Sequence, residues 1–210
     1  DERSVSKAPP LSATWEACLL LAITLLAAFL RFYRLTEIPP GLHYDEAFNG
    51  AMARDMLEGG PPRIFFPENM GEEPLAIYLV MAAVHLLGRE PWVIRLASAL
   101  SGTLTVPLAW WLGREMWRLA RLSRPRGRRE DHVRAAGPAR VELGEQLVGL
   151  GTAAVLAVLY WHLNFSRLGM EPITVPFLAT LSFAALLRGL NGGYGAGPRP
   201  LAFGLSGVAI

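Results

Sequence analysis

The sequence predicts an all-α protein, a polytopic membrane helical bundle with juxtamembrane helices in its first external loop. Of its 210 residues, 52% are hydrophobic and 18% are charged, whereas an average soluble domain carries about 25% charged residues. The apolar residues are clustered, because residues 17–30 and 147–166 contain no Asp, Glu, Lys or Arg. Acidic and basic residues gather in different segments between these runs. The single cysteine, Cys18, excludes a disulfide framework and a cysteine-based metal site.

The membrane spans follow from the lengths of the apolar runs, because a helix needs about 20 residues to cross the hydrocarbon core. Residues 15–33 predict the first span, with Arg31 and Arg34 in an interfacial belt beside Phe32 and Tyr33. Residues 93–112, 147–164 and 173–187 predict three more, and another begins at Leu201. The chain lacks an initiator Met and stops inside this last run, so we expect it to be the amino-terminal part of a longer protein.

The segment 75–87 decides the predicted topology. As a helix it would be about 20 Å long, too short for a core of about 30 Å. Nine Arg lie within residues 113–146, while residues 35–91 hold nine acids and three Arg. If residues 75–87 crossed, the nine-Arg loop would be external, against the bias of basic residues toward cytoplasmic loops. We therefore expect them to lie along the interface, although Arg31 and Arg34 at the outer end of the first span weigh slightly against this.

This topology divides the chain into four regions. Residues 1–14 form a cytoplasmic tail, and residues 113–146 form a basic cytoplasmic loop. Residues 15–112 hold the first span, an external acidic loop with two juxtamembrane helices, and the second span. Residues 147–210 hold the third and fourth spans and the start of a fifth. The predicted location is the plasma or inner membrane, as a multi-pass protein.

The acidic loop carries the candidate chemistry. A turn at residues 39–41 precedes a helix that carries Asp45 and Glu46 in its first turn and ends near Leu57. Acids at a first turn also cap a helix, so capping and a catalytic role both stay open for this pair. A second helix begins at Glu72, Glu73 and a proline. In the predicted topology the link 166–172 returns to the outer face, which places Glu171 on the same side as these acids.

Four sequence elements resemble a known class of enzyme. They are HYDEAFNGAMARDMLEGG (43–60), EEPLAIYLVMAAVHLLG (72–88), WVIRLASALSGTLTVPLAWWLGREMW (92–117) and SRLGMEPITVPFLATLSF (166–183). Together they resemble the GT-C-type membrane glycosyltransferases, most closely the protein-mannosyltransferase-like glycosyltransferase family 39 and its lipid A aminoarabinose transferase relatives. The resemblance covers roughly residues 35–187 except the basic loop, which is longer here than in that family. It implies a helical membrane bundle with two juxtamembrane helices in the first external loop.

The resemblance also implies a reaction and roles for several residues. These enzymes transfer a sugar, with inversion, from a polyprenyl-phosphate carrier to an acceptor on the outer side of the membrane. Asp45 would be the general base for the acceptor hydroxyl, Glu46 would orient the site by pairing with Arg95, and Glu171 would be a second acid. Glu72 and Glu73 hold positions where relatives contact acceptor, donor or metal. One relative pattern has Lys where this chain has Glu73, which argues against a lipid-phosphate role there.

A phosphate leaving group needs cationic stabilisation, for which Arg95 and Arg167 are the candidates near the external ends of spans. Alternatively, Arg95 snorkels to the interface and Arg167 is an interfacial anchor. His43 is equally a loop residue or a ligand. A divalent metal could assist the phosphate, but no His/Asp spacing requires one. The expected partners are a lipid-linked sugar donor, membrane lipid and a protein, lipid or glycan acceptor, without nucleic acid.

Two other functions were weighed against this one. A non-catalytic membrane subunit or scaffold could use the same acidic loop to bind a partner, although a degenerate enzyme would be expected to lose the Asp-Glu pair. A transporter would need charges at mid-membrane depth or broken helices. Here the centres of the spans lack charge, so the transporter is the weaker alternative.

Overall fold

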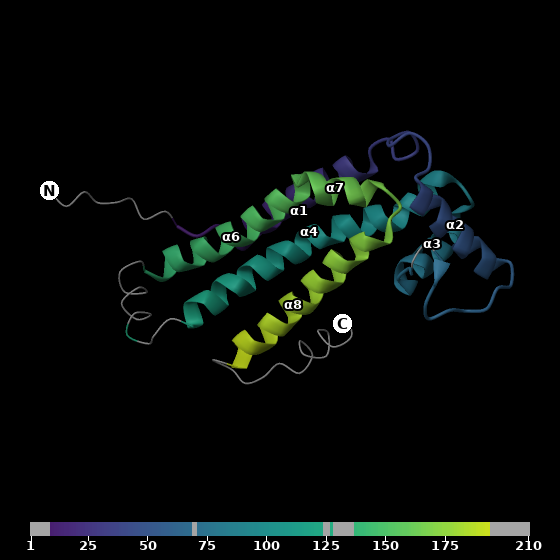
Figure 1. The fold of residues 1–210 in the computed structure, drawn as a ribbon. Helices are drawn as coiled ribbons and strands as arrows, with labels where there is room; N and C mark the ends of the chain where they lie inside the picture. Colours follow the sequence, from purple (N-terminus) through teal and green to yellow (C-terminus); the bar gives the residue numbers. More distant parts are fainter. Residues whose placement is uncertain (1–8, 69–70, 124–126, 128–136, 194–210) are drawn as a thin grey trace. The chain divides into compact units, whose positions relative to one another are not determined.

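The described part of the chain is helical. A computed structural model describes residues 9–68, 71–123, 127 and 137–193. Within these residues there is no β-strand, only an isolated bridge between Phe66 and Glu72. The helices are α1 (Ala13–Phe32), α2 (Tyr44–Leu57), α3 (Pro74–Leu87), α4 (Pro91–Leu122), α6 (Pro138–Val158), α7 (Tyr160–Arg167), the 3₁₀ helix η2 (Glu171–Ile173) and α8 (Thr174–Gly193) (Figure 1).

Four helical segments are long and apolar enough to cross a membrane. They are α1, α4, α6 and the segment Glu171–Asn191, which comprises η2 and most of α8. The apolar side chains of α1 face outward, since Leu25 is 59% exposed and Phe29 is 58% exposed. Such surface suits lipid rather than water. The predicted all-helical, multi-pass class is therefore supported, whereas α3, with 14 residues, is too short to span.

Several predicted helix boundaries differ from the structure, and α6 begins at Pro138, nine residues before the predicted residue 147. α4 continues to Leu122 instead of ending near residue 112, because Arg114 and Arg118 form ion pairs that keep charged residues on a helix. The predicted span 147–164 is divided, since Leu159 adopts an extended conformation between α6 and α7. The predicted fifth span and residues 124–126 and 128–136 of the basic loop lie outside the described residues.

The chain forms two compact units, which we describe separately. The first unit comprises Asp1–Ile23, Pro107–Val155 and Thr180–Ile210, and the second comprises Thr24–Val106 and Leu156–Ala179. In the first unit α4 and α6 lie close together at Gly113 and Gly149. A Cβ added to Gly113 would be only 3.3 Å from the Cα of Gly149. Small residues permit such helix contacts in membranes.

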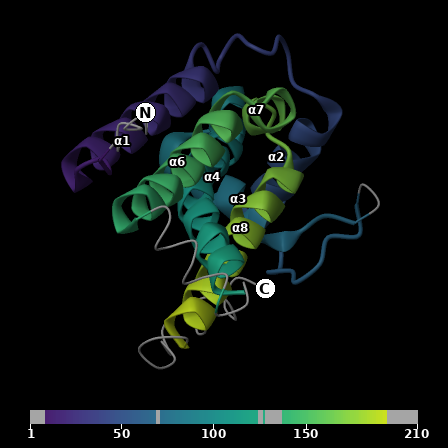
Figure 2. The same cartoon turned by 90° about the vertical axis from the view of Figure 1, so that its left-hand side faces the viewer.

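The second unit contains α2 and α3, which lie side by side (Figures 1 and 2). α3 buries an apolar face, whereas the buried face of α2 carries Met52 and Ala53 together with the polar Glu46 and Asn49. The buried side chains form two clusters, Ala53, Val80, Val84, Val93 and Ile94 in one and Met52, Phe66 and Ile77 in the other. This packing fixes the first turn of α2, where the acidic pair lies.

Candidate functional site

The first turn of α2 carries the predicted acidic pair. His43 is the N-cap, and the backbone N–H of His43 donates to Glu46 Oε2 at 2.7 Å, which forms half of a capping box. The backbone N–H of Asp45 lies 3.4 Å from His43 Nδ1. The capping role that the sequence allowed therefore belongs to Glu46 and His43.

The Asp45 carboxylate is partly exposed and lies beside the imidazole. Its Oδ2 is 3.2 Å from His43 Nδ1, and the Asp45 side chain is 28% exposed. Nδ1 accepts from the Asp45 backbone when it carries no proton, and it donates to the carboxylate when it does. Asp45 is thus reachable from outside and lies within hydrogen-bonding distance of the His43 imidazole.

Glu46 is completely buried in a bidentate ion pair with Arg95. Arg95 Nε donates to Glu46 Oε1 at 2.7 Å and Nη2 donates to Oε2 at 3.1 Å. The remaining Arg95 donors bind the carbonyls of Leu35, Pro39 and Gly41. All five N–H groups of this guanidinium are therefore satisfied by the protein. The predicted pairing is present, and no Arg95 donor is left over for a phosphate.

Glu46 also holds the segment that precedes η2. The backbone N–H of Gly169 donates to Glu46 Oε1 at 2.8 Å. Burial acts to raise the pKa of Glu46, but the hydrogen bonds from Arg95, Gly169 and His43 outweigh it and lower that pKa below its ordinary value. Glu46 therefore remains ionised at neutral pH and ties together α2, α4 and the link after α7.

Asn49 brings Glu171 to the same face of α2 as Asp45. Asn49 Nδ2 donates to the Gly169 carbonyl at 2.9 Å and to Glu171 Oε2 at 3.2 Å. Asn49 and Asp45 are four residues apart, so they share one face of the helix. Asn49 was not predicted from the sequence, although a polar side chain four residues after Asp45, on the same helix face, was a usable signal.

Glu73 approaches the same segment from the start of α3. Its Oε2 lies 3.2 Å from Thr174 Oγ1, which is also 2.8 Å from the Glu171 carbonyl oxygen, so the single hydroxyl proton of Thr174 is shared between these two acceptors. Glu73 is exposed and Glu72 is buried, with the Glu72 backbone N–H bonded to the Phe66 carbonyl at 2.8 Å. Glu73 and Glu171 therefore lie on either side of Thr174, which the sequence analysis did not single out.

Arg167 binds the carbonyl end of α1 and the loop after it. Its Nη1 donates to the carbonyls of Leu30 and Arg31, and its Nη2 donates to those of Tyr33 and Ile38. Burial, and secondarily the charge of Arg95, lower the pKa of Arg167. Four of its five N–H groups are thus occupied within the described residues, so the anchoring role is the one that this geometry supports.

Arg31 is buried rather than interfacial, which corrects the predicted belt. Its Nε donates to Ser166 Oγ at 3.3 Å, Nη1 donates to the carbonyls of Ala27 and Ala157, and Nη2 contacts the carbonyl of Leu156 and His162 Nδ1. Gly102 allows this packing, because an added Cβ would lie 2.7 Å from the Ser166 Cβ. Apolar neighbours on both sides made Arg31 look like a span end.

A pocket of about 260 Å³ lies on a different face of α2. Its lining includes Ala47, Gly50, Ala51 and Arg54 of α2, with Leu42, Val84, Arg89 and Ile94. The spacing of the α2 residues places them opposite the face that Asp45 and Asn49 share. The pocket is therefore separate from the acidic site.

No family model, curated protein or solved structure matches this chain. Within the described residues, no group of three His, Cys, Asp or Glu side chains is arranged to hold a metal ion. The site offers a partly exposed carboxylate, Asp45, next to the buried Glu46–Arg95 ion pair. Two further carboxylates are Glu171, bonded to Asn49, and Glu73, bonded to Thr174.

Proposed function

We propose that this protein is an inverting glycosyltransferase that moves a sugar from a polyprenyl-phosphate carrier to a hydroxyl acceptor on the extracytoplasmic side of a membrane. The observation that carries the proposal is the contrast between Asp45 and Glu46. Glu46 is buried and locked by Arg95, whereas Asp45, the preceding residue, is partly exposed beside His43. A fixed anchor next to an accessible carboxylate is the arrangement that a positioned general base requires.

The reaction proceeds by one displacement. Asp45 takes the proton of the acceptor hydroxyl while its oxygen attacks the anomeric carbon of the donor sugar. The bond between that carbon and the phosphate oxygen breaks, and the polyprenyl phosphate leaves with the bonding electrons. A positioned carboxylate contributes about 10²- to 10⁴-fold to such a step. The leaving group is already an anion, so no general acid is needed on the donor side.

The other side chains take supporting roles in this proposal. Arg95 and Glu46 are positioning residues, because their donors and acceptors bind each other and the backbone. The carboxylates of Glu171, bonded to Asn49, and of Glu73, bonded to Thr174, are suited to bind sugar or acceptor hydroxyls. Arg167 remains the candidate for phosphate contact through its Nε, the donor not engaged in its four carbonyl contacts.

The test of the chemistry is Asp45→Asn, with Asp55→Asn as its matched control. Asp55 lies on the same helix, is 60% exposed and pairs with Arg63. Membranes containing each variant would be given radiolabelled polyprenyl-phosphate sugars, and release of polyprenyl phosphate would be measured. We expect Asp45→Asn to lower the rate at least about 10²-fold and Asp55→Asn to leave it unchanged. Full activity of Asp45→Asn would refute the assignment.

The proposed orientation places residues 1–14 and the basic loop in the cytoplasm, with α2 and α3 on the outer surface. It is supported by the excess of acids in residues 35–91 and of Arg in residues 113–146. Replacing Cys18 by Ser leaves no native thiol. In that background Arg128→Cys should resist an impermeant maleimide in intact cells, and Ile64→Cys, on an exposed loop residue, should react. The opposite labelling pattern would invert the topology.

A further inference from the structure

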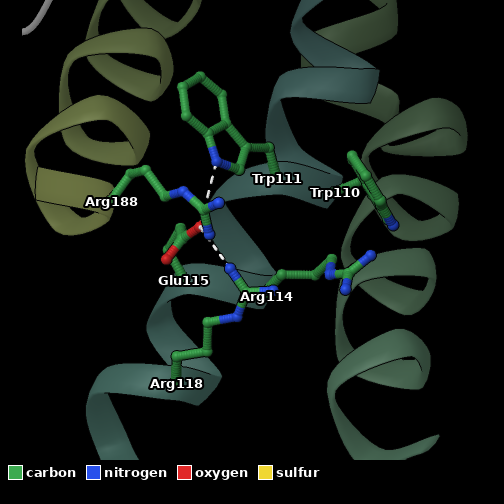
Figure 3. A pocket seen from close by; sticks show the side chains of 6 residues that line it. All are labelled: Trp110, Trp111, Arg114, Glu115, Arg118 and Arg188. Atoms are coloured by element: carbon green, nitrogen blue, oxygen red, sulfur yellow. Dashed lines mark hydrogen bonds and ion pairs between the residues drawn. The ribbon is translucent and has the colours of Figure 1, made fainter. Parts of the chain in front are cut away.

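A second pocket, in the first unit, is lined by arginine and tryptophan. It has a volume of about 450 Å³ and is lined by Trp110, Trp111, Arg114, Glu115, Arg118 and Arg188. Figure 3 shows Arg188 reaching from α8 toward Glu115 on α4. None of these residues belongs to the proposed sugar-transfer site, so the pocket needs its own explanation.

The carboxylates of this cluster lie deeper than the guanidinium groups. The Glu115 side chain is 1% exposed, whereas those of Arg118 and Arg188 are 29% and 34% exposed. Glu115 accepts from Arg118, Arg188, Trp111 and Asn191. The buried Glu115 carboxylate therefore holds the guanidinium groups of Arg118 and Arg188 in place, and their exposed parts line the pocket.

Some guanidinium N–H groups around this pocket have no hydrogen-bond partner within the described residues and can bind a ligand. Arg114 uses Nε, Nη1 and Nη2 on Glu16 and Glu145. Arg118 uses its two Nη atoms, on Glu115 and Glu145. Within the described residues, Arg188 uses only Nη1, on Glu115 at 3.1 Å. The Nε and Nη2 groups of Arg188 and the Nε of Arg118 thus have capacity for an acceptor at the pocket.

The place of the pocket in the first unit indicates the level of lipid headgroups. Its residues lie in the last turns of α4 and toward the end of α8. Trp and Arg at the ends of apolar helices mark a membrane–water interface. Arginine near a helix carboxyl terminus also stabilises the helix dipole. That effect accounts for single residues, but not for three guanidinium groups and two indoles around one cavity.

We propose that this pocket binds the phosphate of an anionic phospholipid headgroup. Basic pockets between membrane helices bind such headgroups, and the planar arginine fork matches phosphate geometry. The lining carries three Arg and one Glu, but Glu16 and Glu145 balance the remaining charge. Recognition therefore depends on directed N–H donors, chiefly from Arg188, and favours a phosphate whose charge is not balanced by a cation of its own headgroup, as it is in phosphatidylcholine. This assignment does not depend on the glycosyltransferase proposal.

The test is native mass spectrometry of the purified chain in detergent micelles, titrated with dioleoylphosphatidylglycerol or dioleoylphosphatidylcholine. We expect the phosphatidylglycerol Kd to be about tenfold lower, and Arg188→Gln to remove that preference. The variant should fold, because Glu115 keeps Arg118, Trp111 and Asn191 as partners. Arg140→Gln, at an exposed arginine of the same unit, is the matched control and should bind like the wild type.

Each outcome decides the proposal. Equal affinity of the wild type for the two lipids would overturn it, whether or not any variant folds. Loss of the preference in Arg140→Gln as well would show nonspecific attraction and would also overturn it. A further arm adds inorganic phosphate: displacement of phosphatidylglycerol by millimolar phosphate would assign the pocket to the free anion instead. Retention of the lipid in that arm supports a headgroup site.

Discussion

Arg95 in the second unit and Arg188 in the first are both paired with glutamate, yet they differ in what their other donors do. Arg95 is 1% exposed at its side chain and spends every N–H on Glu46 or on backbone carbonyls. Arg188 is 34% exposed at its side chain and, among the residues that the structure describes, donates one hydrogen bond, to Glu115. The difference separates an arginine that completes the fold from one that can recognise a ligand.

The comparison shows why charge and position alone misassign arginines in such a chain. Both residues lie in helical segments that form a candidate span, and a possible phosphate role was predicted from the sequence for Arg95 but not for Arg188. Only the count of occupied donors distinguishes them, because a guanidinium that is already saturated gains nothing from an added oxyanion. The same count groups Arg31 with Arg95.

The largest expected effect on this contrast comes from Arg95→Gln. Removing the cation leaves the buried Glu46 carboxylate uncompensated, which costs about 3–5 kcal/mol of unfolding free energy. Arg188→Gln should cost less than about 1 kcal/mol, because its partner is shared and its side chain is partly solvated. Unfolding in mixed detergent–SDS micelles, followed by circular dichroism, measures both. Equal destabilisation by the two variants would contradict the distinction between Arg95, which stabilises the fold, and Arg188, which is available to a ligand.

A smaller effect is expected from acid. The pKa of Glu46 is lower in the folded chain than its ordinary value of 4.5, so ionised Glu46 stabilises the fold fully above that pH. This contribution decreases as the pH falls below 4.5 and through the folded pKa. Glu46→Gln should remove part of this acid dependence, whereas Glu58→Gln, at an exposed pair with Arg89, should keep it. An unchanged pH profile for Glu46→Gln would contradict the assigned pKa.

Much of the fold could be predicted from local signals. The turn at residues 39–41 and the acids before Pro74 placed the start of α2 and of α3 correctly, because turn and first-turn residues act over a few positions. The predicted end of the second span, near residue 112, was wrong, because α4 continues to Leu122. Hydropathy treats Arg114 as a loop residue, while Glu16 and Glu145, distant in sequence, keep it on the helix.

The candidate site could be predicted only in part for the same reason. Asp45, Glu46 and Glu171 were visible as residue types, and the pairing of Glu46 with Arg95 was anticipated. The roles of Asn49 and Thr174 depend on which segments fold against each other, as does the saturation of Arg95. Those contacts join residues up to 122 positions apart. The pattern of polar and apolar residues within a single segment cannot predict them.

Three buried or partly buried arginines of the second unit, Arg31, Arg95 and Arg167, explain how irregular backbone is stabilised in this protein. Arg31 donates to the last carbonyls of α6, Arg167 to those of α1, and Arg95 to the loop that follows α1. Carbonyls released where a helix ends are normally hydrated, and lipid offers no water for this purpose. Each guanidinium therefore replaces the water molecules that would otherwise bind these carbonyls. Because the donors are part of the chain, helices can end and turn where bulk water is scarce.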